Sequence, residues 1–153
     1  MNPEDIKQAF IQTMRPVMIA RGLAPELPNI TAPAGRAGLV EFGRTGSERY
    51  DPTLKGGAVE ERGTFVATVK CAKGDGEDEG NGHAFALSLL FPKGRVLTFA
   101  DDWLTYFTFL QVEIRQPCTI RPGYPDATHW RIPLLIPYEA KAKNPYVPKI
   151  GGE

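Results

Sequence analysis

The feature that most constrains the fold is a stretch near the C-terminus, Thr128–Ala140, in which apolar side chains occupy every second position. This row consists of Trp130, Ile132, Leu134, Ile136 and Tyr138. Successive side chains of a β-strand point to opposite faces, so these five share one face and we expect them in the core. Pro133 and Pro137 fall on the other face, and their missing N–H groups are directed to the same neighbour. The pattern predicts a buried strand with one edge that is open, bulged or next to solvent.

Composition bounds the class of protein. A chain of 153 residues fits one domain with a proper hydrophobic core. Eighteen basic and eighteen acidic residues cancel, which argues against a general nucleic-acid or membrane-surface binder. Cys71 and Cys118 are the only cysteines and form no C-x-x-C pair, so we expect reduced thiols. No apolar run approaches signal length or the ~20 residues that span a bilayer. We therefore expect a protein without a membrane partner that is made and used in a cytoplasm, or that leaves it without the secretory route.

The N-terminal half is expected to hold two helices and two strands. Apolar residues at helical spacing predict an amphipathic helix from Asn2 to Gly22, which Pro16 should kink. The apolar residues with this spacing are Ile6, Phe10, Met14 and Val17. A short strand over residues 39–42, a long polar loop over 43–57 and a longer strand over 58–72 follow. An acidic connection over 74–82 then leads to a helix over 83–91, whose predicted buried face is Phe85, Leu89 and Leu90.

The C-terminal half is expected to be mainly strands. Residues 95–99 and 112–121 are predicted strands, the second with one wet face, and residues 101–110 are ambiguous. The order of elements predicts an α+β fold: one mostly antiparallel or mixed sheet with two helices packed on one face. Residues 1–140 would form this domain. Residues 141–153, with their prolines, lysines and glycines, would form a flexible tail that orders only against a partner.

Catalytic and metal-binding patterns are weak. Asp75, Glu77 and Glu79 resemble the first half of a calcium loop, but Ala86 stands where the bidentate acid belongs. The Gly74-x-Gly76 pair lacks the third glycine of a phosphate loop and is surrounded by acids. The two histidines, His83 and His129, and the two cysteines have no short paired spacing typical of zinc sites, although a Cys–His pair remains conceivable. We therefore expect no enzyme, no cofactor and no metal.

A basic, partly aromatic region is the main candidate for an interface. It comprises Arg44, Arg49, Tyr50, Lys55 and Arg62, mostly within the predicted 43–57 loop. One interpretation is a solvated loop, and the other is an interface that meets a negatively charged surface, either protein or packaged DNA. Tyr146, in the predicted tail, is the remaining candidate contact residue.

The order of segments over residues 3–140 resembles the tail terminator-like proteins of tailed bacteriophages. The similarity is carried by Pro28-Asn29-Ile30 after the first helix, Gly56-Gly57 before Arg62-Gly63-Thr64-Phe65, Phe91-Pro92-Lys93-Gly94 after the second helix, and the closing segments Trp130–Leu134 and Ile136–Ala140. Residues 101–110 and the tail after Ala140 depart from this pattern.

The resemblance implies a structural virion protein without catalytic residues. Such proteins form a ring, expected to be a hexamer, that caps the tail tube, ends its polymerisation and contacts a head-completion or neck protein. DNA would only pass through the lumen, and the protein would assemble in the host bacterial cytoplasm and end in the virion tail. The alternatives are a tail tube or head–tail connector subunit, a small enzyme and a nucleic-acid-binding module. Discrete rings, further polymerisation, a converged Cys–His site or retention of DNA would distinguish them.

Overall fold

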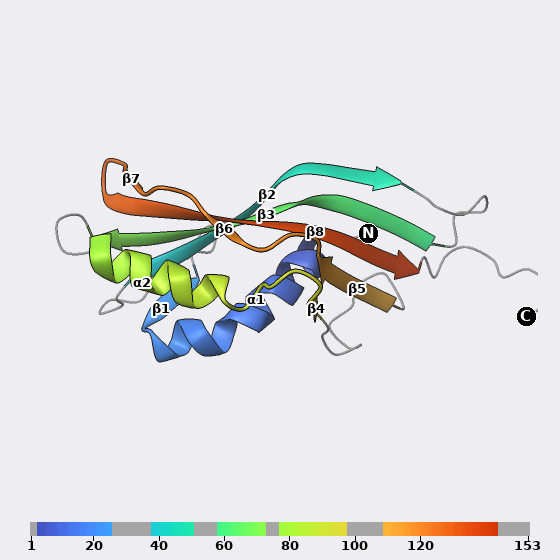
Figure 1. Cartoon of the computed structure of the whole chain (residues 1–153), viewed down its shortest axis with the longest axis horizontal. Coiled ribbons are helices and arrows are strands. Elements are labelled where there is room, and N and C mark those ends of the chain that lie inside the picture. Colours follow the sequence, from blue (N-terminus) through green and yellow to red (C-terminus); the bar gives the residue numbers. More distant parts are fainter. Residues whose placement is uncertain (1–2, 26–37, 51–57, 73–76, 98–108, 144–153) are drawn as a thin grey trace, which may run out of the picture.

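The predicted C-terminal strand, β8 (His129–Lys143), is a central strand of the protein, which is described by a computed structural model over residues 3–25, 38–50, 58–72, 77–97 and 109–143 (Figure 1). It belongs to an eight-stranded sheet with the main order β1-β2-β3-β8-β5-β4, and β6 and β7 also pair with β8. The other elements, in chain order, are α1 (Pro3–Ala20), β1 (Leu23–Pro25), β2 (Gly38–Tyr50), β3 (Ala58–Ala72), α2 (Glu77–Ser88), β4 (Val96–Leu97), β5 (Phe109–Ile114), β6 (Thr119–Ile120) and β7 (Tyr124–Pro125).

The predicted fold class is confirmed. Only β1 and β2 pair in parallel, and the other pairs are antiparallel. Both helices lie on one face of the sheet, and no described helix lies on the other face (Figure 1). The molecule is therefore a two-layer α+β structure with one face of its sheet free of helices.

The proline edge of β8 is interrupted, as the sequence predicts. The full length of β8 pairs with β3 on one side, but β5, β6 and β7 share the other side as separate short strands. Pro137 lies opposite the break between β5 and β6, and Pro133 lies opposite the break between β6 and β7. Each proline carbonyl still accepts a backbone hydrogen bond of 2.9 Å, from the N–H of Arg115 and Arg121 respectively. A proline removes the donor but keeps the acceptor, which explains this segmented edge.

The core lies between the helices and the alternating row of β8. Ile132, Leu134, Ile136 and Tyr138 are buried as predicted, and Trp130 is half-buried. Phe10 of α1 stacks on Phe65 of β3 with ring centroids 4.1 Å apart, and Tyr138 meets Phe10 edge-on at 5.7 Å. The helical spacing of α1 is confirmed: Ile6, Phe10 and Met14 are fully buried, and Val17 packs against the core. Such aromatic pairs contribute roughly 0.5–1.5 kcal/mol beyond their burial.

The predicted 43–57 loop is wrong in its first half. Residues 43–50 continue β2, which pairs with β3 as far as Tyr50, opposite Glu60. The register shifts between Thr45 and Glu48, and Gly46 there has a φ of 62°, which glycine adopts without a steric penalty. The polar composition of this strand suggested a loop, but pairing with β3 outweighs weak local propensity.

The predicted second helix is also corrected. It begins at Glu77 rather than His83, and Phe85 and Leu89 are exposed rather than buried. The buried face consists of Gly80, His83, Ala84 and Leu87, followed by Phe91. A Cβ on Gly80 would lie 2.9 Å from Ile132 Cδ1 and 3.0 Å from Cys71 Sγ, so α2 packs closely on the sheet through its small residues. Phe85 and Leu89 consequently point outward.

The predicted 112–121 strand is two strands. β5 ends at Ile114 and β6 begins at Thr119, because β8 offers no donor at Pro137 between them. Ile120, expected on the buried face, is 36% exposed. The predicted strand over 95–99 is observed as β4, Val96–Leu97. Residues 98–108 lie outside the described residues, as do residues 73–76, which include the start of the predicted acidic connection.

Candidate interaction surfaces

The paired ends of four strands continue beyond the part of the sheet that the helices cover (Figure 1). We call this region the sheet extension; it comprises Glu48–Tyr50, Ala58–Glu60, Phe109–Gln111 and Lys141–Lys143. The strands stay in register to its tip, where Ala58 and Phe109 both pair with Lys143. The extension is therefore an ordered continuation of the same sheet rather than a loop.

A buried polar cluster holds the base of the sheet extension. Arg44 of β2 lies opposite Phe65, on the helix-bearing face. Its guanidinium forms a close ion pair with Glu61 of β3 and donates to the Tyr138 hydroxyl at 3.2 Å. That hydroxyl donates to Glu61 Oε2 at 2.8 Å. Glu61 is only 3% exposed, so this carboxylate depends on its donors for solvation.

The same cluster alters the chemistry of Tyr138. Burial and the neighbouring Glu61 carboxylate raise the pKa of Tyr138 to about 12. The hydroxyl therefore remains protonated and donates at physiological pH. Arg44, Glu61 and Tyr138 come from three adjacent strands, so the cluster joins β2, β3 and β8 where they leave the helix-covered core.

A second charged group lies on the helix-free face of the sheet, at the residues of β3 and β8 that follow Glu61 and Tyr138. Arg62 Nε donates to Glu139 Oε2 at 2.9 Å, and Lys141 Nζ lies 3.8 Å from Glu139 Oε1. Arg62 is 46% exposed, so this pair contributes little to stability, typically below ~1 kcal/mol. It places charges of both signs on the exposed surface of this face.

The predicted interface residues thus separate into different roles. Arg44 is committed to the internal cluster, whereas Arg62 lies exposed on the helix-free face. Arg49 and Tyr50 belong to β2, opposite Glu61 and Glu60, within the sheet extension. Lys55 and Tyr146 lie outside the described residues. The sequence predicted that Arg44, Arg49, Tyr50 and Arg62 lie in or next to a loop. The structure places them on paired strands.

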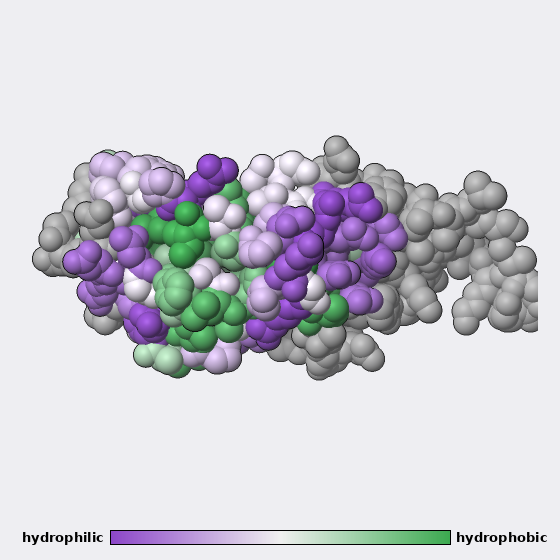
Figure 2. Space-filling view, in the orientation of Figure 1, coloured by the Kyte–Doolittle hydropathy of each residue, from purple (hydrophilic) through white to green (hydrophobic). Residues whose placement is uncertain are grey.

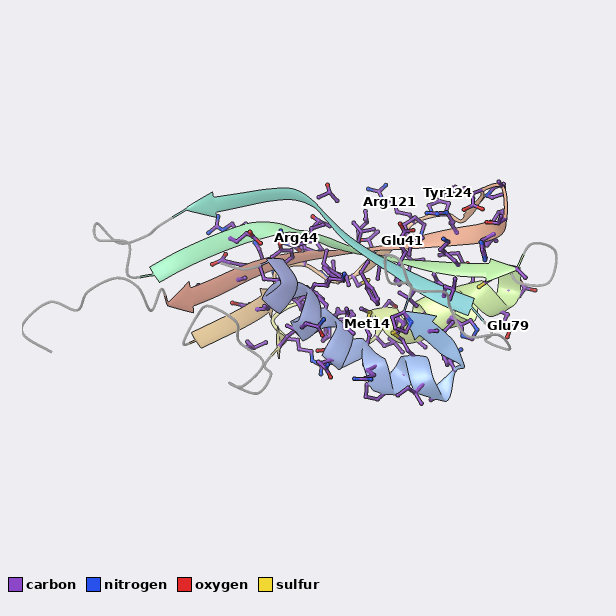
Figure 3. All side chains as sticks on the ribbon, turned by 180° about the vertical axis from the view of Figure 1, so that it is seen from behind. Met14, Glu41, Arg44, Glu79, Arg121 and Tyr124 are labelled. Atoms are coloured by element: carbon purple, nitrogen blue, oxygen red, sulfur yellow. The ribbon has the colours of Figure 1, made fainter. Side chains whose placement is uncertain are left out.

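The other end of the helix-free face carries a third charged group. Arg131 of β8 donates to Glu41 of β2 at 2.9 Å and to Asp126 at 2.5 Å. Asp126 also accepts from the backbone N–H groups of Thr128 and His129, and its pKa lies well below the usual range because of Arg131 and these two donors. Figure 3 shows Arg121 and Tyr124 on this face and Met14 and Glu79 on the opposite side of the sheet. Charges of both signs alternate here.

The helix-bearing side exposes large apolar side chains. Phe85 and Leu89 of α2 are 59% and 65% exposed, and Ile19 of α1 is also exposed. Figure 2 shows apolar residues gathered over the face that carries the two helices. Sequence analysis missed this surface because it assigned Phe85 and Leu89 to the core. The row Gly80, His83, Ala84 and Leu87 could have revealed it. These residues have helical spacing, and the small ones among them let the helix pack closely on the sheet.

The two histidines and two cysteines all lie in the described part of the chain, and no reactive site is seen around them there. Cys71 is buried beside α2, and burial raises the pKa of the Cys118 thiol to about 11. Among the described residues, no group of three His, Cys, Asp or Glu side chains could hold a metal ion. Within the same ranges, no helix has the length and apolar character needed to cross a membrane.

His83 forms a local link between the helices. Arg21, just after α1, donates through Nη1 to His83 Nδ1 at 3.2 Å, so the remaining proton belongs on Nε2, 3.7 Å from Glu79 Oε1. Burial and the Arg21 charge lower the pKa of His83, with Glu79 opposing them. The Arg21–His83 hydrogen bond thus joins the end of α1 to α2.

Comparison with known families decides the identity. The family described as phage tail terminator protein matches residues 5–138. The chain belongs to this family. A solved structure that is 20% identical matches with a TM-score of 0.58, covering 97% of this chain and 99% of the other chain. That similarity supports the fold alone. A search of curated proteins finds no match.

Membership in the phage tail terminator family gives the chain a structural role in the phage tail. The match spans α1, the whole described sheet up to Tyr138 and α2, but it ends before the tip of β8. The family implies contacts with other tail proteins.

Proposed function

We propose that this tail protein caps the tail tube as a closed ring, ends tube polymerisation and offers a surface to a head-completion or neck protein. A ring subunit needs two different surfaces, because each copy contacts its neighbours through opposite sides. The sheet extension and the N-terminal end of α2 lie at opposite ends of the molecule (Figure 1). Six copies would close the ring, and DNA would pass through its lumen.

The sheet extension is the observation that carries this proposal. Four strands continue past the helices and remain paired with one another to the end of β8. A buried ion pair and a tyrosine hydroxyl fix the direction of these strands at the base. A projection of paired strands suits a contact with another subunit, since it loses little conformational freedom on binding.

The candidate contact residues follow from this geometry. Arg49, Tyr50 and Arg62 would meet the neighbouring subunit or the tube, together with Lys55 and Tyr146 from outside the described residues. Arg44 would act indirectly by fixing the base of the sheet extension. Arg49→Glu should therefore weaken assembly without unfolding the protein. Glu113→Arg, a charge reversal of an exposed β5 residue that lies outside the sheet extension, opposite Val96 of β4, is the matched control.

The function is tested by adding the protein to polymerising tail tube protein and measuring tube lengths in negative-stain images. A cap should halt elongation and leave a ring density at one end of each tube. Arg49→Glu should leave tubes longer, whereas Glu113→Arg should act like the wild type. Incorporation of the protein along the tube, or its own growth into tubes, would instead identify a tube subunit. Unchanged tube lengths with no end density would reject capping.

A further inference from the structure

One stripe of α2 combines acidic and apolar side chains. Asp78, Phe85 and Leu89 are separated by seven and four residues, so they lie on one face of the helix. All three are exposed, and they point away from the buried Gly80 and Leu87. We call these three residues the α2 stripe. Two neighbouring large apolar side chains beside a carboxylate suit a segment that is both apolar and basic.

The residues that follow β8 have this composition. Tyr146, Val147 and Ile150 are apolar or aromatic, Lys143 precedes them and Lys149 lies between Val147 and Ile150. Pro145 and Pro148 restrict the residues before them to extended backbone, which lowers the entropy lost when such a segment binds. Its chemistry is therefore complementary to the α2 stripe in both apolar character and charge.

The position of β8 keeps these apolar residues away from the α2 stripe of the same copy. Gly80 approaches Ile132, which precedes the end of β8 by eleven residues, or about 36 Å at the usual strand rise. Because the helix runs towards the sheet extension (Figure 1), the nine steps from Gly80 to Leu89 shorten this distance to Lys143, but by only ~14 Å. At least ~20 Å therefore separates Leu89 from Lys143 along the strand. Tyr146 and Val147 can extend only ~11 and ~14 Å beyond Lys143.

We propose that Tyr146 and Val147 of one copy bind the α2 stripe of the neighbouring copy, with a lysine of this segment near Asp78. This inference rests on the proposed ring, because only a neighbour whose α2 faces the sheet extension can receive the segment. Tyr146 and Val147 with their neighbouring residues, which we call the strap, would thus be exchanged between copies at each subunit interface. Each copy would donate its segment at one end and accept another at the opposite end, which is the arrangement that a closed head-to-tail ring requires.

Cysteine cross-linking between two full-length chains tests the exchange. One chain carries Leu89→Cys, the other carries Tyr146→Cys and a larger tag, and both have Cys118→Ala. After mixing and mild oxidation we expect a covalent dimer of one tagged and one untagged chain. The chain with both cysteines should give a ladder of covalent oligomers. Val96→Cys, on exposed β4, replaces Leu89→Cys as the control and should yield at least tenfold less dimer.

The failures of the two proposals are distinguishable. Solution mass of the uncross-linked wild type reports the ring, whereas the cross-link reports the strap. Discrete oligomers without the Leu89–Tyr146 cross-link, or a cross-link found only within one chain, would overturn the strap and leave the ring intact. A monomeric wild type would overturn the ring and the strap with it. Phe85→Ser with Leu89→Ser, both exposed, should reduce the oligomer at limiting concentration as strongly as Tyr146→Ser with Val147→Ser.

Discussion

At the scale of single residues, the structure depends on a few positions where a small or polar side chain permits a close contact. Gly80 lets α2 approach Ile132 and Cys71, and Gly123 lets the Trp130 ring lie against the backbone, since a Cβ there would come within 2.4 Å of Trp130 Nε1. Arg44 and Tyr138 solvate the buried Glu61 carboxylate. These positions, more than the large apolar residues, determine how the two layers meet.

Gly80→Ala should destabilise the protein, whereas Gly82→Ala should stabilise it. Both residues lie in α2, where alanine is favoured over glycine by roughly 0.5–1 kcal/mol. At Gly82 the added Cβ meets only Arg21 Nη1 at 3.9 Å, so this gain is retained. At Gly80 it would overlap two core side chains, at a cost of roughly 1–3 kcal/mol. Urea unfolding measures both; equal stabilisation by the two variants would contradict the close contact.

Removing the Glu61 carboxylate should cost more than removing the tyrosine hydroxyl. Tyr138→Phe keeps the ring against Phe10 and loses hydrogen bonds, for an expected loss of about 1 kcal/mol. Glu61→Ala leaves Arg44 without its buried counter-ion and creates a cavity, for an expected loss of about 3 kcal/mol. Denaturant unfolding gives both values, and a neutral Glu61→Ala would show that the cluster does not hold the strands.

His83 should make stability decline in mild acid. Its pKa is lowered in the folded protein, so the unfolded chain binds the proton more readily once the pH falls below the ordinary value of about 6.5. This contribution to stability is complete above that value and is lost progressively below it. The free energy of unfolding of His83→Gln should therefore fall less between pH 7 and pH 5 than that of the wild type. An identical slope in both proteins would show that His83 is not held neutral.

At the scale of elements, sequence periodicity predicted α1, β3 and β8 because their apolar positions follow one regular spacing. It failed for β2 because Gly46 and its polar neighbours are typical of loops, and only the pairing with β3 makes them a strand. It failed for the face of α2 because Phe85 and Leu89 are more apolar than Gly80 and Ala84, while the contact distance favours the smaller residues. Arg44, Arg49, Tyr50 and Arg62 lie on paired strands rather than in or next to the predicted loop, and their role as an interface stays a prediction.

The bulge in β2 gives a test at this scale. Gly46→Thr should cost about 1 kcal/mol or more, since a β-branched residue is strained at a φ of 62°. Gly43→Thr, in the same strand with an unobstructed Cβ direction, should be neutral or stabilising. Hydrogen exchange at residues 48–50 should accelerate in Gly46→Thr alone. Equal protection in the two variants would show that the sheet extension does not depend on the bulge.

At the scale of the whole molecule, no helix of the described ranges covers one sheet face, the strands project at one end, and α2 presents an exposed stripe towards the other. This polarity is what distinguishes a component of an assembly from an isolated globular domain. A neutral net charge adds no long-range repulsion between copies. The ring that we propose requires contacts between opposite ends of neighbouring copies.

Native mass measurement of the full-length protein across a hundredfold range of concentration tests the ring most directly. We predict one discrete closed species besides the monomer, at about 101 kDa for six copies of the 16.8 kDa chain, with no larger forms accumulating as concentration rises. A monomer at every concentration, or a ladder of masses that lengthens without limit, would contradict the account.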